Sequence, residues 1–239
     1  MTFAGDIDPN LGITHANSIA KRISSNDNVP PPQKVYASPF LRTVHTGHII
    51  ATAVHAKVRI EEGLTEWQVP SLLEVDGIRT FPKTATEHAK HFDSIDLEYR
   101  SLNPLVMTDD AHQNDAVATG SPQFPESEEK LVVRCATTLE KILENAKGDN
   151  IAIVAHAPCV IGMALHLAGM SLKQSTLDAW PLGGLTLFSR PILNKNNGKN
   201  DHESIQYGDW TMEFFGSSDH MPGEYKNGLK RWTLPSLSA

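Results

Sequence analysis

The chain has 239 residues, a formal net charge of −7 and two cysteines, and 40% of its residues are hydrophobic. This length fits one large domain with a sizeable core, and the composition excludes global disorder. The acidic balance gives no electrostatic reason to expect a nucleic-acid partner, and two cysteines suit a reducing compartment better than a disulfide framework. The longest apolar stretches, Ile151–Ala155 and Cys159–Leu165, are too short to span a membrane, and the first residues carry no secretory signal. We therefore expect residues 1–239 to form a single cytoplasmic domain that binds neither membrane nor nucleic acid.

Helices and strands are expected to alternate along the first part of the chain. Apolar residues recur at helical spacing over Thr14–Ile23, and Lys34–Ala37 is typical of a short buried strand. Ser38 is a suitable N-cap with a proline after it, which predicts a helix over Pro39–Val54. Val58–Ile60 is expected to form the next strand.

The second part of the chain continues this alternation after an irregular insertion at about residues 80–125. The expected elements are a helix around Thr84–Phe92 within the insertion, a helix at Glu126–Ala146, a strand at Ile151–Ala155, a helix closed by Gly169, a strand at Gly184–Ser189, a polar loop at about residues 194–209 and an edge strand at Thr211–Phe215. We expect Gly184–Ser189 to be the last strand of the main sheet. The pattern predicts a three-layer α/β/α fold with a mostly parallel sheet. No strand is predicted before the first helix.

Three polar residues are expected at the edge of the sheet where ligands bind, beyond the carboxyl ends of the strands. Arg42 lies in the first turn of a helix, where its guanidinium can bind an anion such as phosphate beside free backbone N–H groups. His156 directly follows a strand and is placed to donate hydrogen bonds or transfer protons. Glu66 follows Val58–Ile60 and has apolar neighbours, which are expected to raise its pKa as a general acid requires.

Other patterns favour structural roles. Each of the three polar residues has an ordinary alternative, as a surface arginine, a core histidine or an unremarkable glutamate. His45 and His48, like His88 and His91, have the spacing of two ligands on one helix face, but no third ligand is evident. We therefore expect no metal site and no cofactor, and a histidine-ligated metal hydrolase is only a third hypothesis. Cys159 begins a helix, where a thiol can be acidified, but a packing role is expected.

Several segments resemble one known family. Residues 38–47, Ser-Pro-Phe-Leu-Arg-Thr-Val-His-Thr-Gly, resemble the Ser-Pro-x-x-Arg-x-x-x-Thr-Ala motif of the histidine phosphatase, or phosphoglycerate-mutase-like, superfamily. Gly63–Glu66 is similar to its Gly-Leu-x-Glu segment, and Ile153–Ala157 is similar to its Val-x-His-Gly/Ala segment. Glu126 and Ser127 followed by Arg134 resemble its Glu-Ser…Arg helix. The order and spacing agree from about residue 8 to residue 190.

The resemblance implies a phosphatase that acts on phosphomonoesters without a metal. In this family a histidine attacks the phosphoryl group, a carboxylic acid protonates the leaving oxygen, and water hydrolyses the phosphohistidine. By resemblance, Arg42 would clamp the phosphate, His156 would be the second phosphate-binding histidine, and Glu66 would be the proton donor. The implied partner is a phosphorylated substrate or phosphate itself.

The sequence departs from the family at the nucleophile. The family carries it in an Arg-His-Gly motif at the end of the first strand, and no Arg-His-Gly occurs in this chain. The resemblance therefore implies that the first strand of the sheet is apparently missing from the sequence. His15 is the nearest histidine, but it falls on a helix and is not expected to replace it. Two hypotheses follow, namely a phosphatase whose sequence is incomplete at the N-terminus, or a catalytically inactive phosphate-binding or interaction module of the same fold. The sequence specifies neither the substrate nor the oligomeric state.

Overall fold

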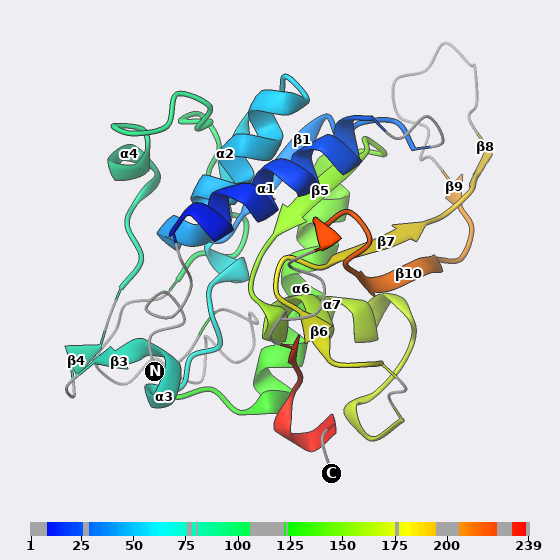
Figure 1. Ribbon diagram of the computed structural model, residues 1–239. Helices are drawn as coiled ribbons and strands as arrows, with labels where there is room; N and C mark the ends of the chain where they lie inside the picture. The colour runs from blue at the N-terminus through cyan, green and yellow to red at the C-terminus, as the bar shows by residue number, and fades with distance from the viewer. Residues whose placement is uncertain are drawn as a thin grey trace.

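A parallel sheet of three strands lies at the centre of the computed structural model (Figure 1). The structure describes residues 9–25, 29–75, 78–79, 81–105, 122, 124–174, 177–194, 206–223 and 231–237. The strands are β1 (Lys34–Ala37), β2 (Val58–Ile60) and β5 (Ile151–Val154), in the order β2-β1-β5. Val35 of β1 pairs with Val58 on one side and with Ala152 on the other. The expected strands therefore form, with bounds within one residue of the prediction.

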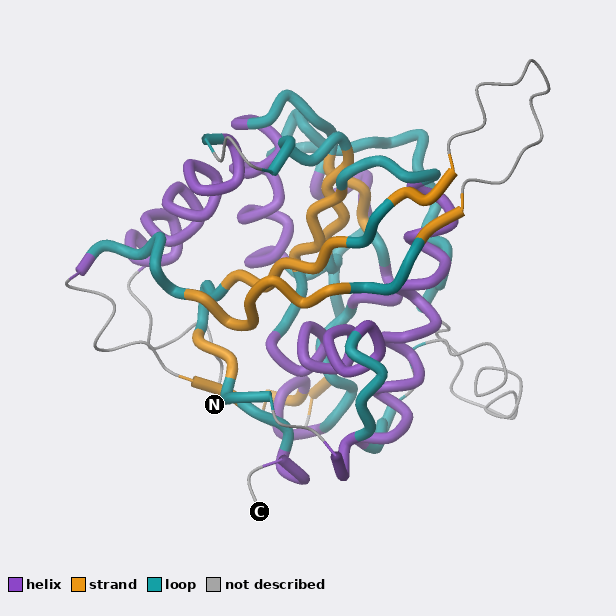
Figure 2. Tube along the Cα trace, turned by 90° about the vertical axis from the view of Figure 1, so that its right-hand side faces the viewer, coloured by secondary structure: helices purple, strands orange, loops and turns teal. Residues whose placement is uncertain are grey.

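Helices cover both faces of this sheet and give the fold its three layers (Figure 2). On one face, α1 (Pro9–Ser24) and α2 (Leu41–Ala53) share a core with the even-numbered residues of β5. On the other face, α6 (Glu128–Ala146) and α7 (Ala157–Leu167) share a second core with the odd-numbered residues. The predicted three-layer α/β/α class is confirmed.

One predicted strand has a different partner from the one expected. The strand β7 (Leu185–Ser189) was predicted to be the last strand of the main sheet, but it pairs antiparallel with β10 (Thr211–Ser217). Within the described residues, these two strands form a separate sheet next to the three parallel strands. Antiparallel pairing with β10 gives the backbone groups along one edge of β7 their hydrogen-bond partners. The apolar pattern of β7 alone does not specify which strand it pairs with.

The remaining elements are short and were mostly not predicted. They are η1 (Glu62–Leu64), α3 (Pro70–Leu73), β3 (Glu74–Val75), β4 (Ile78–Arg79), α4 (Ala85–His88), η2 (Leu172–Gln174), β6 (Trp180–Pro181), β8 (Ile192–Asn194), β9 (Gln206–Tyr207), β11 (Arg231–Trp232) and η3 (Pro235–Leu237). The helix expected around Thr84–Phe92 is only the single turn α4, which Thr84 caps. Much of the insertion expected at residues 80–125, and most of the polar loop expected at 194–209, lie outside the described residues. Within the described ranges, no helix combines the length and the apolar character needed to cross a bilayer.

Candidate active site

The three candidate residues meet at the carboxyl edge of the parallel sheet. The Nη2 atom of Arg42 lies 2.8 Å from Oε2 of Glu66 and 2.9 Å from Nδ1 of His156. The same imidazole nitrogen lies 3.0 Å from Glu66 Oε2. The structure therefore brings together all three side chains that the sequence singled out.

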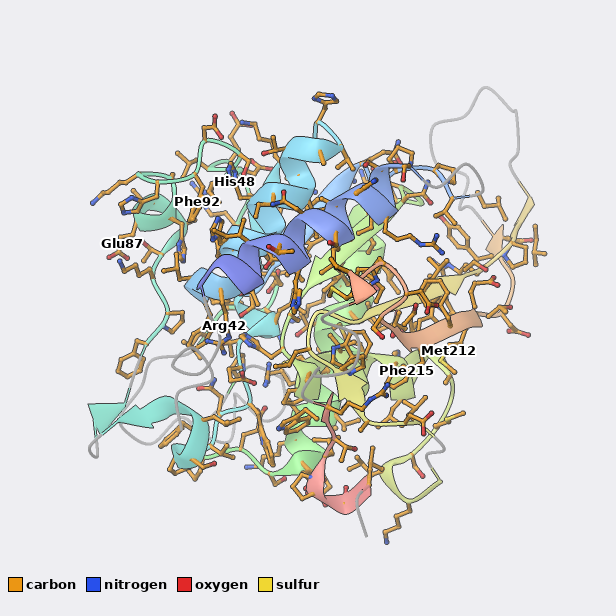
Figure 3. All side chains as sticks on the ribbon, viewed as in Figure 1. Arg42, His48, Glu87, Phe92, Met212 and Phe215 are labelled. Carbon is orange, nitrogen blue, oxygen red and sulfur yellow. The ribbon has the colours of Figure 1, made fainter. Side chains whose placement is uncertain are left out.

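Each residue reaches this point from a different strand. Arg42 lies in the first turn of α2, which follows β1, and Figure 3 labels it at the start of that helix. His156 follows β5 and precedes α7, and Glu66 lies after η1, which follows β2. Because β1, β2 and β5 are parallel neighbours, their carboxyl ends share one edge. The side chains of Glu66 and His156 are 8% and 2% exposed, whereas that of Arg42 is 44% exposed, so the guanidinium is the member open to a ligand.

Two residues of the β1–α2 segment fix the orientation of the His156 ring. Ser38 Oγ lies 2.8 Å from Nε2 of His156, and the Phe40 ring meets the imidazole edge to face at 5.3 Å. Both ring nitrogens therefore have partners, Nδ1 in Arg42 and Glu66 and Nε2 in Ser38. Ser38 was predicted to be the N-cap of α2, and that prediction was wrong. Phe40 occupies the N-cap without a side-chain bond, and the Ser38 hydroxyl is committed to the histidine.

The expectation that Glu66 has a raised pKa is also wrong. Burial alone would raise it, but the hydrogen bonds and charges of His156 and Arg42 lower the pKa of the Glu66 carboxyl to about 2. Burial lowers the pKa of His156, and the Glu66 carboxylate offsets this only in part. In this arrangement Glu66 is a carboxylate paired with a guanidinium, so it holds no proton to donate.

A buried ion pair holds the segment that carries Glu66. Arg134 of α6 donates from Nε and Nη2 to the two carboxylate oxygens of Glu126, at 2.7 and 2.8 Å. Its Nη1 atom donates to the carbonyl oxygens of Gly63 and Thr65, at 2.8 and 3.0 Å. Both side chains are 1% exposed. The Glu126–Arg134 pair therefore fixes the backbone on the N-terminal side of Glu66 and does not face the ligand edge.

Sequence reasoning had identified Glu126 and Arg134 only through the family resemblance, and it had missed the contact between Ser38 and His156. The pattern Glu-Ser followed by an arginine on an amphipathic helix was a usable signal for the ion pair. Ser38 gave no such signal, because a serine before proline is ordinary at a helix start.

The histidine pairs show no metal site. His48 Nδ1 lies 2.8 Å from Ser94 Oγ, and His88 Nε2 lies 2.7 Å from the carbonyl oxygen of Pro39. Figure 3 shows His48 beside Phe92, away from Arg42. No cluster of three potential metal ligands occurs among the residues that the structure describes. The Cys159 thiol is buried and its pKa is raised, first by the hydrogen bond with Cys135 and then by burial, which fits the expected packing role.

The candidate residues open into a cavity of about 1010 Å³. Arg42, Glu66 and His156 contribute to its wall, together with His15 of α1. Burial lowers the pKa of His15. The cavity thus extends from the carboxyl ends of the parallel strands to helix α1.

A comparison with protein-family models identifies the family to which the chain belongs. The family model described as the histidine phosphatase superfamily (branch 1) matches residues 3–190. The chain belongs to the histidine phosphatase superfamily. The segments that carry the three clustered residues all fall inside the matched region, so the family resemblance of the motifs is confirmed.

Two curated proteins match part of this chain. The human ubiquitin-associated and SH3 domain-containing protein B is 31% identical over 147 residues, which cover 59% of this chain and 20% of that protein. The mouse protein of the same name matches to the same extent. The chain thus spans about a fifth of the length of the curated relatives it matches.

Solved structures agree in fold. A mycobacterial glucosyl-3-phosphoglycerate phosphatase, solved with VO3, has a TM-score of 0.52 at 16% identity over 91% of each chain. A phosphoserine phosphatase from Entamoeba histolytica, solved with 3-phosphoglyceric acid, has a TM-score of 0.51 at 17% identity over 93% of this chain and 90% of its own. At these identities the likeness establishes the fold.

Proposed function

We propose that this chain binds the phosphate group of a phosphomonoester at the Arg42–Glu66–His156 cluster and supplies the phosphate-binding and proton-donating groups of a phosphatase. The observation that carries the proposal is the meeting of a guanidinium, a carboxylate and an imidazole within 3.0 Å at the carboxyl ends of three parallel strands. These groups match the needs of phosphoryl transfer, which are positive charge on the phosphate oxygens and an acid for the leaving oxygen.

Phosphate binding would reverse the protonation of Glu66. A phosphate dianion accepts hydrogen bonds from the Arg42 guanidinium and from Nδ1 of His156, and so takes both partners away from Glu66. The carboxylate then lies beside an anion instead of a cation, and its pKa rises. A protonated Glu66 can donate its proton to the ester oxygen as the phosphorus–oxygen bond breaks, so that the product leaves as a neutral alcohol. The low pKa of the free site is therefore compatible with a proton donor in the loaded site.

The nucleophile separates this proposal from a second candidate. A complete phosphatase of this family needs an Arg-His-Gly segment, which the 239 residues do not contain, so the proposal requires that a preceding segment supplies it. The specific alternative is a catalytically inactive phosphate-binding or interaction module, which needs only the cluster that the described residues already form.

The 239 residues are further proposed to form one domain that acts in the cytoplasm. Helices from both halves of the sequence pack on the same sheet, and Cys135 and Cys159 are both free thiols although each is buried. Limited proteolysis that releases two stable fragments would contradict the single domain, and recovery of the protein outside the cytoplasmic fraction would contradict its location.

Binding of orthovanadate and inorganic phosphate to the purified chain tests the proposal, followed by hydrolysis of an aryl phosphate. We expect Arg42→Ala and His156→Ala each to weaken vanadate binding about tenfold to a hundredfold, since each removes a hydrogen bond to a charged group. Arg100→Ala is the matched control, because Arg100 is exposed and contacts only local carbonyl oxygens. Unchanged binding in the first two variants would contradict the phosphate site.

Turnover decides between the two candidates. Hydrolysis that His156→Ala abolishes and that chelators do not affect, with an acid-labile phosphohistidine, would favour the enzyme. Binding without turnover, both in the 239 residues and in a chain extended by the upstream coding sequence, would favour the inactive module. Hydrolysis that requires added zinc would contradict both and support metal chemistry.

A further inference from the structure

His88 of α4 is a buried histidine that does not line the cavity of the candidate site. The residue is 1% exposed, and its Nε2 atom lies 2.7 Å from the carbonyl oxygen of Pro39. Because a carbonyl oxygen can only accept a hydrogen bond, the Nε2 atom carries a proton and donates it. This hydrogen bond joins α4 to the β1–α2 segment, which lies far from it in the sequence.

The carbonyl oxygen of Pro39 is the one hydrogen-bonding group of that residue. Proline has no N–H, and a buried carbonyl oxygen without a donor destabilises the fold. The carbonyl oxygens on either side, those of Ser38 and Phe40, accept hydrogen bonds from the Thr43 hydroxyl at 2.9 and 2.7 Å. Thr43 belongs to the helix that follows, so it moves with the segment. His88 comes from a different element and therefore holds the segment from outside.

The neighbours of Pro39 make the contacts that orient the candidate site. Ser38, directly before it, lies 2.8 Å from the Nε2 atom of His156 through its hydroxyl. Phe40, directly after it, places its ring 5.3 Å from the His156 ring and 4.9 Å from the guanidinium carbon of Arg42. A shift of the Pro39 carbonyl therefore changes the orientation of both the imidazole and the guanidinium.

The element that carries His88 is itself fixed to the edge of the parallel sheet. Val58 of β2 donates its N–H to the carbonyl oxygen of Ser94 and accepts a hydrogen bond from the N–H of Asp96, both at 2.8 Å. The chain after α4 thus pairs with β2 in parallel. At its other end, α4 begins with a capping box at Thr84. The imidazole therefore donates from a base that is held at both ends.

The same part of the chain also contacts the body of α2. The Phe92 ring lies 5.1 Å from the ring of His48, and the Nδ1 atom of His48 lies 2.8 Å from the hydroxyl of Ser94. Figure 3 shows Phe92 next to His48. The chain from His88 to Ser94 therefore runs beside α2, and His88 holds the segment that leads into the first turn of this helix, where Arg42 lies.

We propose that His88 is a positioning residue of the phosphate site, because its hydrogen bond to Pro39 sets the orientation of the segment that carries Ser38 and Arg42. The inference rests on the proposed function of this site. His88 does not touch the ligand and acts through the main chain of Pro39. A role in packing alone is the alternative, and it predicts a loss of stability without any change in ligand binding.

Vanadate titration of the folded variants separates positioning from packing. His88→Leu removes the donor, and we expect it to weaken vanadate binding about threefold to tenfold. In His88→Gln the side-chain amide can still donate to the Pro39 carbonyl, so we expect binding within about twofold of the parent chain. His91→Leu is the matched control, because it makes the same change three residues along, at an exposed side chain, and should leave binding unchanged.

A double-mutant cycle tests whether His88 acts through this segment. Ser38→Ala combined with His88→Leu should weaken vanadate binding by less than the product of the two single losses, because both changes release the same contact of His156. The nitrogen NMR signals of the His156 ring should shift in His88→Leu and stay unchanged in His91→Leu. If His88→Leu does not fold, His88→Asn takes its place, since its shorter side chain does not reach Pro39.

Several results would overturn the proposal. They are parent-like vanadate binding in His88→Leu at any stability in urea, a failure of His88→Gln to restore binding, single losses that multiply in the cycle, or unchanged His156 signals in His88→Leu. A parent chain that binds no vanadate contradicts the proposed function instead. The His156 signals then decide the role of His88 by themselves, so the two failures give different results.

Discussion

Glu66 shows how two neighbouring side chains determine the chemistry of one carboxyl group. It is buried, which by itself favours the neutral acid, yet the hydrogen bonds and charges of His156 and Arg42 favour the carboxylate and lower its pKa to about 2, from an ordinary value of 4.5. A carboxyl whose pKa is lowered by folding stabilises the folded state above its unfolded pKa and loses that contribution as the pH falls toward the folded pKa.

The first prediction concerns this pH dependence. The advantage of the parent chain over Glu66→Gln in the free energy of unfolding should be constant near neutral pH and shrink as the pH falls from about 5 toward 2. The ionisation of Glu66 accounts for ~3 kcal/mol of this change. Urea unfolding of both proteins at a series of pH values measures it. A difference that stays constant down to pH 3 would show that Glu66 is not held as a carboxylate.

The second prediction concerns Ser38, whose hydroxyl lies 2.8 Å from the His156 ring and is fully buried. In Ser38→Ala the Nε2 atom of His156 loses its buried partner, and we expect a loss of about 1–3 kcal/mol in stability together with weaker vanadate binding. Ser24→Ala is the control, since the Ser24 hydroxyl is exposed and reaches only the Lys21 carbonyl oxygen at 3.4 Å. Equal effects of the two substitutions in urea unfolding and vanadate titration would contradict the positioning role of Ser38.

At the scale of elements, the Glu126–Arg134 pair joins the start of α6 to the segment that carries Glu66. Its two charges are out of water, so removing one of them leaves the other buried without its partner. The third prediction is that Arg134→Met lowers the free energy of unfolding by about 3–5 kcal/mol. The double variant Glu126→Gln with Arg134→Met should recover part of this loss.

A comparison with a more open ion pair controls this experiment. Arg59 and Asp96 form a pair whose side chains are 24% and 20% exposed. Because solvent screens this pair, Arg59→Met should lower the free energy of unfolding by about 1 kcal/mol or less. If Arg134→Met costs no more than Arg59→Met in urea unfolding, the buried pair does not hold the segment as inferred.

The elements also show which features the sequence could specify. The strands β1 and β5 were predictable because their apolar residues are contiguous and polar turns bound them, and the parallel topology then placed Arg42, Glu66 and His156 at one edge. The pairs formed by two-residue strands, such as Trp180–Pro181 with Arg231–Trp232, are too short to show any periodicity. The protonation of Glu66 was not predictable from its apolar neighbours in sequence, because its partners come from other strands.

At the scale of the whole molecule, two cores lie on opposite faces of a narrow sheet, and among the described residues its strand β5 pairs with β1 alone. Strand edges with unpaired backbone groups are sites at which chains associate. What opposes association is mutual repulsion between copies, which depends on the formal net charge of −7.

The fourth prediction follows from this balance. As the pH falls from about 7.5 toward 6, the net charge approaches zero, because the sequence pI is about 5.9. Burial lowers the pKa values of His15, His156 and His220, so these three contribute less to the change. We expect self-association, measured by light scattering at fixed protein concentration, to rise over this range, and added salt to produce a similar rise at pH 7.5 by screening the repulsion. Association that is independent of pH and salt would mean that repulsion between the charged copies does not control it.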